Sequence, residues 1–301
     1  MNAKHVELIA VVAEAGSLGA AALVLNRSQP AISKALQSAE ADIGCQIFQR
    51  SPTGVVPTVE GRRVVARCRM IQRDLGLLSE DIAQIGGDMS GTLNLVVSPL
   101  SAVRIMPHLL NRYRRQFPDV QVQVISGQHT EAFQKLHDRS ADYVLGPAPK
   151  AHEATGLRSK PIARTGISFV TGKTSRYLHE TEPRALQQAL WLMIGPRKRV
   201  PLYKQYFDAH GLSYPAPVIC SDSILTILSM IEGSDFLCSF PSQLVPSLSK
   251  RWALAEAAVP SGHPDIALAL TAEAGRVPTI AALAFEDLVQ TIAGDLSLGD
   301  T

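Results

Sequence analysis

Apolar residues recur in one long, regular pattern in the first third of the chain. Seven of them are spaced alternately four and three residues apart: Val64, Cys68, Ile71, Leu75, Leu78, Ile82 and Ile85. This heptad spacing predicts a continuous helix, about 33 Å long at roughly 1.5 Å per residue, with one apolar seam. The seam favours pairing with a second copy of the helix, and packing within its own chain is the alternative.

The residues before this helix predict three short helices and a hairpin. Gly16 ends the first helix, and Ser17 and Ser28 are suitable N-caps for the second and third. Pro30 falls in the first turn of the third helix, where a missing N–H costs nothing. The stretch "RSPTGVVPT", residues 50–58, is rich in proline and glycine and predicts a tight hairpin or wing.

The third helix combines a small apolar face with an outer face that can form hydrogen bonds. The outer residues are Gln29, Ser33, Lys34 and Gln37. Glutamine can pair with adenine and lysine with guanine or phosphate, and Ser28 with the first free N–H groups suits a phosphate oxygen. We therefore expect the reading helix of a helix-turn-helix, with a plain surface helix as the alternative.

Charge supports this expectation weakly. Eight arginine or lysine residues stand against three acidic residues between Arg27 and Arg73, although the whole chain carries a net charge of only +2. A local basic excess attracts a phosphate backbone, and it is equally compatible with a solvated basic surface.

After Gly91 the pattern alternates between strands and helices. This order predicts a parallel sheet with helices outside it, repeated in two α/β lobes with ligands between them. The predicted domains are a winged helix-turn-helix (1–61), a linker and dimerisation helix (62–90), a first effector lobe (91–163 and 266–301) and a second lobe (164–265). The fold class is thus multidomain α/β, and its two-lobed effector-binding domain resembles periplasmic binding proteins.

Polar residues at predicted strand ends of the first lobe suggest an effector site. A hydroxyl cap at a helix N-terminus favours anions, because free N–H groups point at the ligand. The alternative is a helix cap that binds nothing. The candidate residues are Ser98, Pro99 and Ser101 after one strand and Gln128, His129 and Thr130 after the next.

The second lobe supplies further candidates. One strand ends at Ile194, and the basic loop after it would offset a bound anion unless its side chains are simply solvated: Arg197, Lys198 and Arg199. Ser221 is expected to begin a helix, and Phe240 to form an aromatic wall. These residues favour a small organic anion, such as an aromatic carboxylate or sulfonate.

Composition excludes several other classes. With 46% hydrophobic and 19% charged residues, the chain has the make-up of ordinary globular domains. No stretch approaches the roughly 20 apolar residues that span a bilayer, and no signal peptide is evident, so we expect a cytoplasmic protein. The four cysteines form no C-x-x-C pattern, so neither a metal, a disulfide nor a cofactor is expected.

The N-terminal segment resembles the DNA-binding module of LysR-type transcriptional regulators. The resemblance runs without a gap over about fifty positions, and the predicted linker helix and α/β lobes extend it to the whole chain. The matching residues are Ala21-Ala22, Leu25, Ser28-Gln29-Pro30-Ala31, Ser33, Glu40, Gly44, Phe48, Arg50, Thr58 and Gly61.

The resemblance implies a homo-oligomer, commonly a tetramer, that binds double-stranded operator DNA and a small-molecule inducer, with RNA polymerase as a further candidate partner. It implies that Gln29, Pro30, Ser33 and Lys34 face the major groove, and that Arg50 and Thr53 approach the DNA backbone or minor groove. Within the family, the chain resembles the toluenesulfonate-responsive regulators, although no residue identifies the inducer.

The sequence departs from the family pattern at several positions of the module. The departures are Ile9, Leu18-Gly19, Lys34, Ala39, Pro57 and Glu60. They put the base preference in doubt more than DNA binding itself.

Two other classes of protein compete with a regulator. An enzyme would need an unrecognised site, because none of the common nucleophile, phosphate-binding or zinc motifs is present. A solute-binding protein shares the two-lobed architecture, but residues 1–61 would then have no role.

Overall fold

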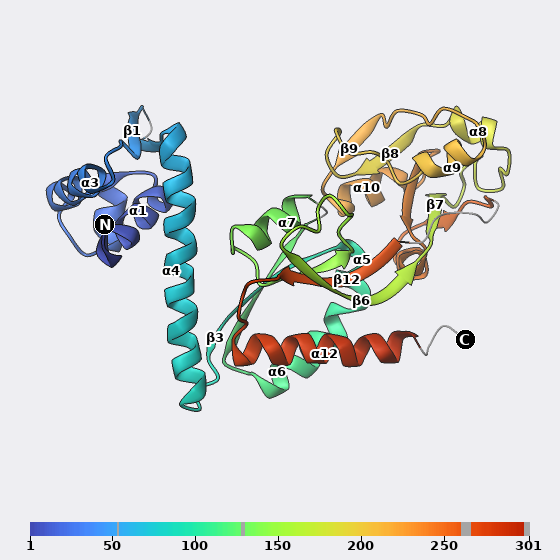
Figure 1. The fold of residues 1–301 in the computed structure, drawn as a ribbon. Helices are drawn as coiled ribbons and strands as arrows, with labels where there is room; N and C mark the ends of the chain where they lie inside the picture. Colours follow the sequence, from blue (N-terminus) through green and yellow to red (C-terminus); the bar gives the residue numbers. More distant parts are fainter. Residues whose placement is uncertain (53, 128–129, 260–265, 298–301) are drawn as a thin grey trace. The chain divides into compact units, whose positions relative to one another are not determined.

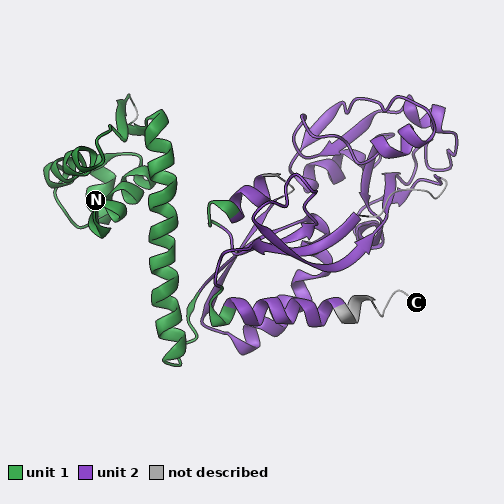
Figure 2. Ribbon diagram, in the orientation of Figure 1, with its two compact units in different colours: residues 1–91, 137–140, 278–281 green, residues 92–136, 141–277, 282–301 purple. Residues whose placement is uncertain are grey.

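A computed structural model describes residues 1–52, 54–127, 130–259 and 266–297. The chain forms two compact units (Figure 2). The first contains residues 1–91 together with residues 137–140 and 278–281, and the second contains the other described residues. Each unit is considered by itself.

The first unit is a winged helix-turn-helix followed by a long helix (Figure 1), as the sequence predicted. Its helices and strands are α1 (Ala3–Ala15), α2 (Leu18–Val24), α3 (Gln29–Ile43), β1 (Phe48–Ser51), β2 (Gly54–Pro57) and α4 (Val59–Ile85). Both predicted caps are confirmed: the Ser17 hydroxyl accepts from Ala20 N at 3.1 Å and the Ser28 hydroxyl from Ala31 N at 3.4 Å.

The hairpin is fastened to the helices at two points. Gly54, with φ 140°, would place a Cβ atom 2.2 Å from the Gly16 carbonyl oxygen, which accepts a hydrogen bond from Val55 N at 2.8 Å. A Cβ atom at Gly61 would lie 1.9 Å from the Ile47 carbonyl oxygen. Both positions therefore require glycine, because the backbones approach too closely for any side chain.

The seam of α4 divides into two parts. Cys68 is 1% exposed and belongs to the core of the winged domain, and Val64 packs against that core. From Ile71 the seam is exposed, rising from 42% at this residue to 78% at Ile85. The first two seam positions are therefore internal packing, and this corrects the expectation of one uninterrupted pairing surface.

The second unit holds two sheets of five strands each. We call the first lobe the sheet in the order β4-β3-β5-β12-β6, and the second lobe the sheet in the order β11-β7-β10-β8-β9. The strands of the first lobe are β3 (Gly91–Val97), β4 (Val120–Ser126), β5 (Tyr143–Pro147), β6 (Leu157–Thr165) and β12 (Ile266–Glu273). Those of the second are β7 (Ile167–Gly172), β8 (Trp191–Ile194), β9 (Ile219–Ser221), β10 (Leu237–Pro241) and β11 (Leu254–Glu256).

The expectation of purely parallel sheets is only partly correct. β3 and β5 are parallel, as are β8 with β9 and β8 with β10. However, β12 runs antiparallel to β5 and β6, and β7 runs antiparallel to β10 and β11. β7 and β12 are the strands by which the chain passes between the lobes. Among the described residues, no crossover helix leads into either strand, and parallel neighbours in one sheet require one.

Helices lie against both sheets (Figure 1). The helical segment after β3 is broken at Ile105, because Pro107 lacks the N–H that a continuous helix would use. The helices are α5 (Pro99–Arg104), α6 (Met106–Gln116), α7 (Thr130–His137), α8 (Pro183–Gln187), α9 (Lys204–Ala209), α10 (Ile224–Ile231), η1 (Ser242–Leu244), α11 (Val245–Ser249) and α12 (Ile280–Ser297).

A buried carboxylate joins α12 to the first lobe. Glu286 is 3% exposed and accepts hydrogen bonds from Tyr143 Oη at 2.9 Å and from two Arg158 nitrogens at 2.5 and 2.7 Å. Lys160 Nζ lies 2.9 Å from the same carboxylate. The hydrogen bonds from Arg158, then those from Lys160 and Tyr143, lower the pKa of Glu286 from 4.5 to about 2, against burial, which raises it.

This lowered pKa predicts that the stabilisation provided by Glu286 decreases in acid. Unfolded Glu286 takes up a proton near pH 4.5, whereas the folded protein resists protonation down to about pH 2. Its contribution is thus complete above pH 4.5 and is lost as the pH falls towards 2. Urea titrations should show Glu286→Gln less stable by about 1–3 kcal/mol at pH 7, with the difference shrinking below pH 4.5. A difference that stays constant down to pH 3 would contradict this account.

The described residues contain no helix long and apolar enough to cross a lipid bilayer. All four cysteines are free: Cys68 and Cys238 are buried, and Cys45 and Cys220 are half-buried. Within the same residues, no cluster of His, Cys, Asp and Glu side chains has the geometry of a metal site.

Candidate functional site

The outward face of α3 is built as the sequence predicted. Ser28, Gln29, Pro30 and Lys34 are exposed, as is Gln37, while Ser33 is half-buried. The opposite face is anchored by three buried residues of the winged-domain core: Ile32, Leu36 and Ala39. Ala31 is exposed as well. The helix thus presents four hydrogen-bonding side chains near its N-terminal half.

The wing carries an exposed cation. Arg50 lies in β1 opposite Val55 of β2, and its side chain is exposed. Thr53, the other predicted wing contact, lies outside the described residues. An exposed arginine on a hairpin is suited to phosphate oxygens.

Glu40 fixes the wing to α3, a role that the sequence did not reveal. Its carboxylate accepts hydrogen bonds from Ile47 N at 2.7 Å and Phe48 N at 3.1 Å. Thr58 acts similarly at the other end of the hairpin, donating to the Gln46 carbonyl at 2.8 Å while capping α4 through Gly61 N at 2.9 Å. These bonds join the hairpin to α3 on one side and to α4 on the other.

A pocket that is partly open to solvent lies between the two lobes of the second unit. Both sheets contribute to its mostly apolar wall, and among the predicted residues Ser98, Pro99, Ile194 and Phe240 line it. The other lining residues are Leu100, Pro147, Thr165, Met193, Arg199, Val200, Pro201, Leu202, Ser239, Pro241, Leu244, Ile266 and Leu268. A concave, mostly apolar wall with a few polar groups suits a small, largely apolar organic molecule.

Ser98 combines a capping role with a place in the pocket wall. Its hydroxyl accepts from Ser101 N at 3.3 Å and lies 2.9 Å from the Ser101 hydroxyl. Ser101 is fully buried and does not line the pocket, and its hydrogen bonds orient Ser98. A direct contact of Ser101 with an effector stays a prediction. Because α5 has only six residues, its dipole adds little attraction for an anion.

Among the described residues of the pocket wall, the charged one is Arg199, which the sequence placed with Arg197 and Lys198 in a basic loop that could offset a bound anion. Its N–H donates to the Pro196 carbonyl at 2.9 Å, and this turn carries its side chain to the pocket. Burial lowers the pKa of Arg199, and the Glu153 carboxylate opposes that effect. An arginine still keeps its charge at neutral pH, so the pocket contains one positive group in a mostly apolar wall.

Arg197 and Ser221 lie apart from this pocket. They line a separate, more open hollow together with Glu131, Cys220 and Asp222. Ser221 was expected to begin a helix, but it ends β9, and Ser223 caps α10 instead. The strand simply continues further than the sequence suggested. The predicted effector residues are thus divided between two sites.

The structure does not describe the side chains of three predicted effector residues. Gln128 and His129 lie outside the described residues, and Thr130 is placed only by its backbone as the first residue of α7. Their contact with an effector stays a prediction.

Two family models match the chain. The model described as "Bacterial regulatory helix-turn-helix protein, lysR family" matches residues 3–62, and the "LysR substrate binding domain" matches residues 86–293. The chain belongs to the LysR family. This assignment confirms the predicted class, a DNA-binding transcriptional regulator with an effector-binding domain, and decides against a solute-binding protein because the helix-turn-helix model covers the N-terminal domain.

Several relatives of this LysR-family chain are named as transcriptional regulators, which supports a regulator over an enzyme. The regulator GalR of Pseudomonas putida is 27% identical over 79% of this chain, a match that spans 60% of GalR itself. The SDS degradation transcriptional activation protein of a Pseudomonas strain is 26% identical over 92% of each chain. The solved structure of CbnR, a LysR family transcriptional regulator, has a TM-score of 0.69 at 21% identity and covers 97% of this chain and 99% of its own.

Proposed function

We propose that α3 reads operator DNA in the major groove through Gln29, Pro30, Ser33, Lys34 and Gln37, with Ser28 and the wing on phosphates. The observation that carries this proposal is the exposed polar face of α3, held by a buried apolar face behind it. Glutamine and lysine at such positions can discriminate base edges. Arg50 would contact the backbone beside them, as would Thr53.

We further propose that the pocket between the lobes binds a small organic anion as effector. Its apolar wall would bury the body of the molecule, and Ser98 with Arg199 would face the anionic group. The relative named for SDS degradation is compatible with a sulfur-containing amphiphile, and an aromatic carboxylate or sulfonate fits the same chemistry. The open hollow with Arg197 and Ser221 has less apolar wall and is the weaker candidate.

The oligomer that we propose is a dimer through α4, assembled further into a tetramer in the cytoplasm. Paired α4 helices would hold two reading helices at a fixed separation on half-sites of a partly palindromic operator. Effector binding between the lobes would change the angle between dimers and so the DNA bend, which RNA polymerase would sense. The domain boundaries at residues 61/62, 90/91, 163/164 and 265/266 belong to the same proposal.

Two measurements on one selected duplex test the DNA-binding and effector parts of the proposal separately. The wild-type protein would select a duplex from a random library, and its affinity would be measured against salt, where a regulator must show a steep negative slope. Footprints on the selected duplex would then be compared with and without p-toluenesulfonate, benzoate and octanoate. A flat salt dependence would refute DNA reading. Superimposable footprints at every anion concentration would refute the effector-driven change in bend.

The dimer proposal predicts a large effect of charge on α4. Leu75 and Ile82 are 49% and 63% exposed in the single chain, so replacing each with glutamate costs little in the monomer. In a paired seam the introduced carboxylates of the two copies would be buried and would repel each other. Dimerisation should therefore weaken at least about 100-fold. Sedimentation equilibrium measures this directly. Glu60→Gln, an exposed change on the same helix, is the control, and an unchanged dimer in Leu75→Glu/Ile82→Glu would contradict the seam.

A further inference from the structure

Gly19, in the first turn of α2, is a glycine that the fold does not require. A Cβ atom at this position would have one neighbour within 4 Å among the described residues outside its own helix, the Oε1 atom of Gln29 at 3.8 Å. By contrast, a Cβ atom at Gly54 or Gly61 would lie within 2.2 Å of a backbone oxygen. The φ angle of Gly19 is not positive either, so its backbone suits any residue. Because glycine weakens a helix relative to alanine, packing and backbone geometry do not account for Gly19.

The atom that Gly19 faces belongs to the first residue of the reading helix. Gln29 begins α3, and its side chain is exposed. Within the described residues its amide makes no hydrogen bond, whereas the nearby Glu40 carboxylate is held by two backbone N–H groups. Nothing in this part of the chain therefore fixes which way the Gln29 amide points.

An unrestrained amide can read more than one base. Its oxygen accepts hydrogen bonds and its nitrogen donates them, and a half turn of the terminal group exchanges the two atoms. In one orientation glutamine pairs with adenine, which offers a donor and an acceptor in the major groove. In other orientations its nitrogen can donate to guanine or thymine, and its oxygen can accept from cytosine.

A hydroxyl group on residue 19 would remove this freedom. The oxygen of a serine lies one bond beyond Cβ, so a Gln29 Oε1 atom 3.8 Å from Cβ is within reach of its hydrogen bond. The hydroxyl would donate to Oε1 and fix the positions of the amide oxygen and nitrogen. Glycine is the residue that leaves this partner out, and Gly19 is also one of the positions where the chain departs from the LysR pattern.

We propose that Gly19 is a specificity-determining position of the DNA-reading surface, because it leaves Gln29 able to accept more than one base at the base pair that it faces. This inference rests on the proposed reading role of α3. The DNA that it defines is an operator whose two half-sites differ at that base pair, so that two identical chains bind two unequal sequences. Gly19 acts through Gln29 and not on the DNA itself.

Duplexes selected from a random library test this proposal. The full chain would be used as wild type, Gly19→Ser and Gln29→Ala, and the base frequencies at each position of the half-site would be compared. Gln29→Ala locates the base pair that Gln29 reads, and wild type should accept more than one base there. Gly19→Ser should favour one of these bases by about 3- to 10-fold more than wild type does, as expected for one added hydrogen bond.

Gly19→Ala is the matched control. It adds the Cβ atom without the hydroxyl, so it should raise the melting temperature through α2 and leave the base preference as in wild type. Gly19→Thr supplies the hydroxyl a second time and should narrow the preference in the same direction as Gly19→Ser. Combining Gly19→Ser with Gln29→Ala should abolish the narrowing, because the hydroxyl then has no amide to hold.

Three results would overturn the role of Gly19. They are equal effects of the serine and alanine variants, a narrowing that persists without Gln29, and a wild type that already accepts one base only at the pair concerned. If Gln29→Ala changed no position, the reading role of Gln29 would fail together with that of Gly19. If wild type enriched no duplex at all, the proposed DNA-binding function would itself fail.

Discussion

Replacing Gln29, Ser33 and Lys34 together by alanine should abolish most of the protein's sequence-specific DNA affinity. Each well-made contact to a base edge discriminates by about 1–3 kcal/mol, so the loss should reach at least about 100-fold on the duplex that wild type selects. The helix should persist, because alanine favours helices and none of the three side chains is fully buried. Fluorescence anisotropy with labelled duplex measures the effect.

The salt dependence separates base reading from general charge attraction. Losing Lys34 should reduce the slope of log affinity against log salt by about 1 if it contacts a phosphate, and leave it unchanged if it contacts guanine. Lys4→Ala removes the same charge from an exposed position of α1 and is the matched control. If the triple variant kept its circular dichroism spectrum and bound the selected duplex like wild type, α3 would not be the reading helix.

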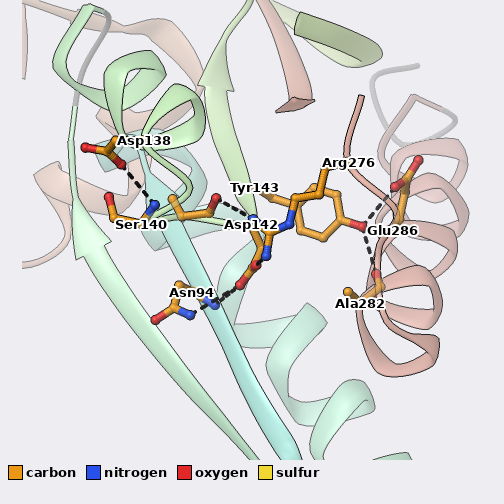
Figure 3. A network of polar contacts seen from close by, with 9 residues as sticks. Asn94, Asp138, Ser140, Asp142, Tyr143, Arg276, Ala282 and Glu286 are labelled. Carbon is orange, nitrogen blue, oxygen red and sulfur yellow. Dashed lines mark hydrogen bonds and ion pairs between the residues drawn. The ribbon is translucent and has the colours of Figure 1, made fainter. Parts of the chain in front are cut away.

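Asp142→Ala should destabilise the second unit by about 3–5 kcal/mol, because it leaves a buried cation without its partner. Asp142 and Arg276 form an ion pair with side chains only 7% and 9% exposed (Figure 3). Asp142 also accepts from Asn94 N at 2.5 Å, and Arg276 donates to the Ala141 carbonyl at 3.0 Å. The pair joins β3, β5 and the segment after β12, so its loss affects several strands at once.

Urea unfolding followed by tryptophan fluorescence isolates this effect. Both tryptophans, Trp191 and Trp252, belong to the second unit. Asp287→Ala, an exposed carboxylate of α12, should change the unfolding free energy by less than about 0.5 kcal/mol. Asp142→Leu with Arg276→Met should recover much of the stability, since no buried charge remains. A loss of unfolding free energy below about 1 kcal/mol in Asp142→Ala would contradict the strong dependence of Arg276 on this carboxylate.

The sequence was most informative where one local pattern decides the structure. Caps and helix-ending glycines depend on nearest neighbours, so Ser17, Ser28 and Gly16 marked helix ends correctly. The outer face of α3 followed from periodicity alone. Packing between segments that are distant in the sequence was harder to predict. Cys68 continues the heptad pattern, yet it packs in the winged-domain core, because α1 lies against α4.

The effector pocket could be located only coarsely for a related reason. Neighbouring residues of one loop reach different sites, since the turn from Pro196 to Arg199 sends Arg199 to the pocket while Arg197 lines the other hollow. A basic cluster in the sequence cannot show which of its members turns inward. Ser221 was misplaced because β9 extends to it, and strand ends depend on the neighbouring strand.

The packing of Cys68 into the winged domain has a geometric consequence for the operator. Because α4 starts inside that domain, its exposed apolar stripe has a fixed angular phase relative to α3. Inserting one residue between Cys68 and Ile71 would rotate the stripe by about 100° and lengthen the rod by about 1.5 Å. In a dimer paired through α4, the number of residues in this helix would thus set the separation of the two DNA half-sites.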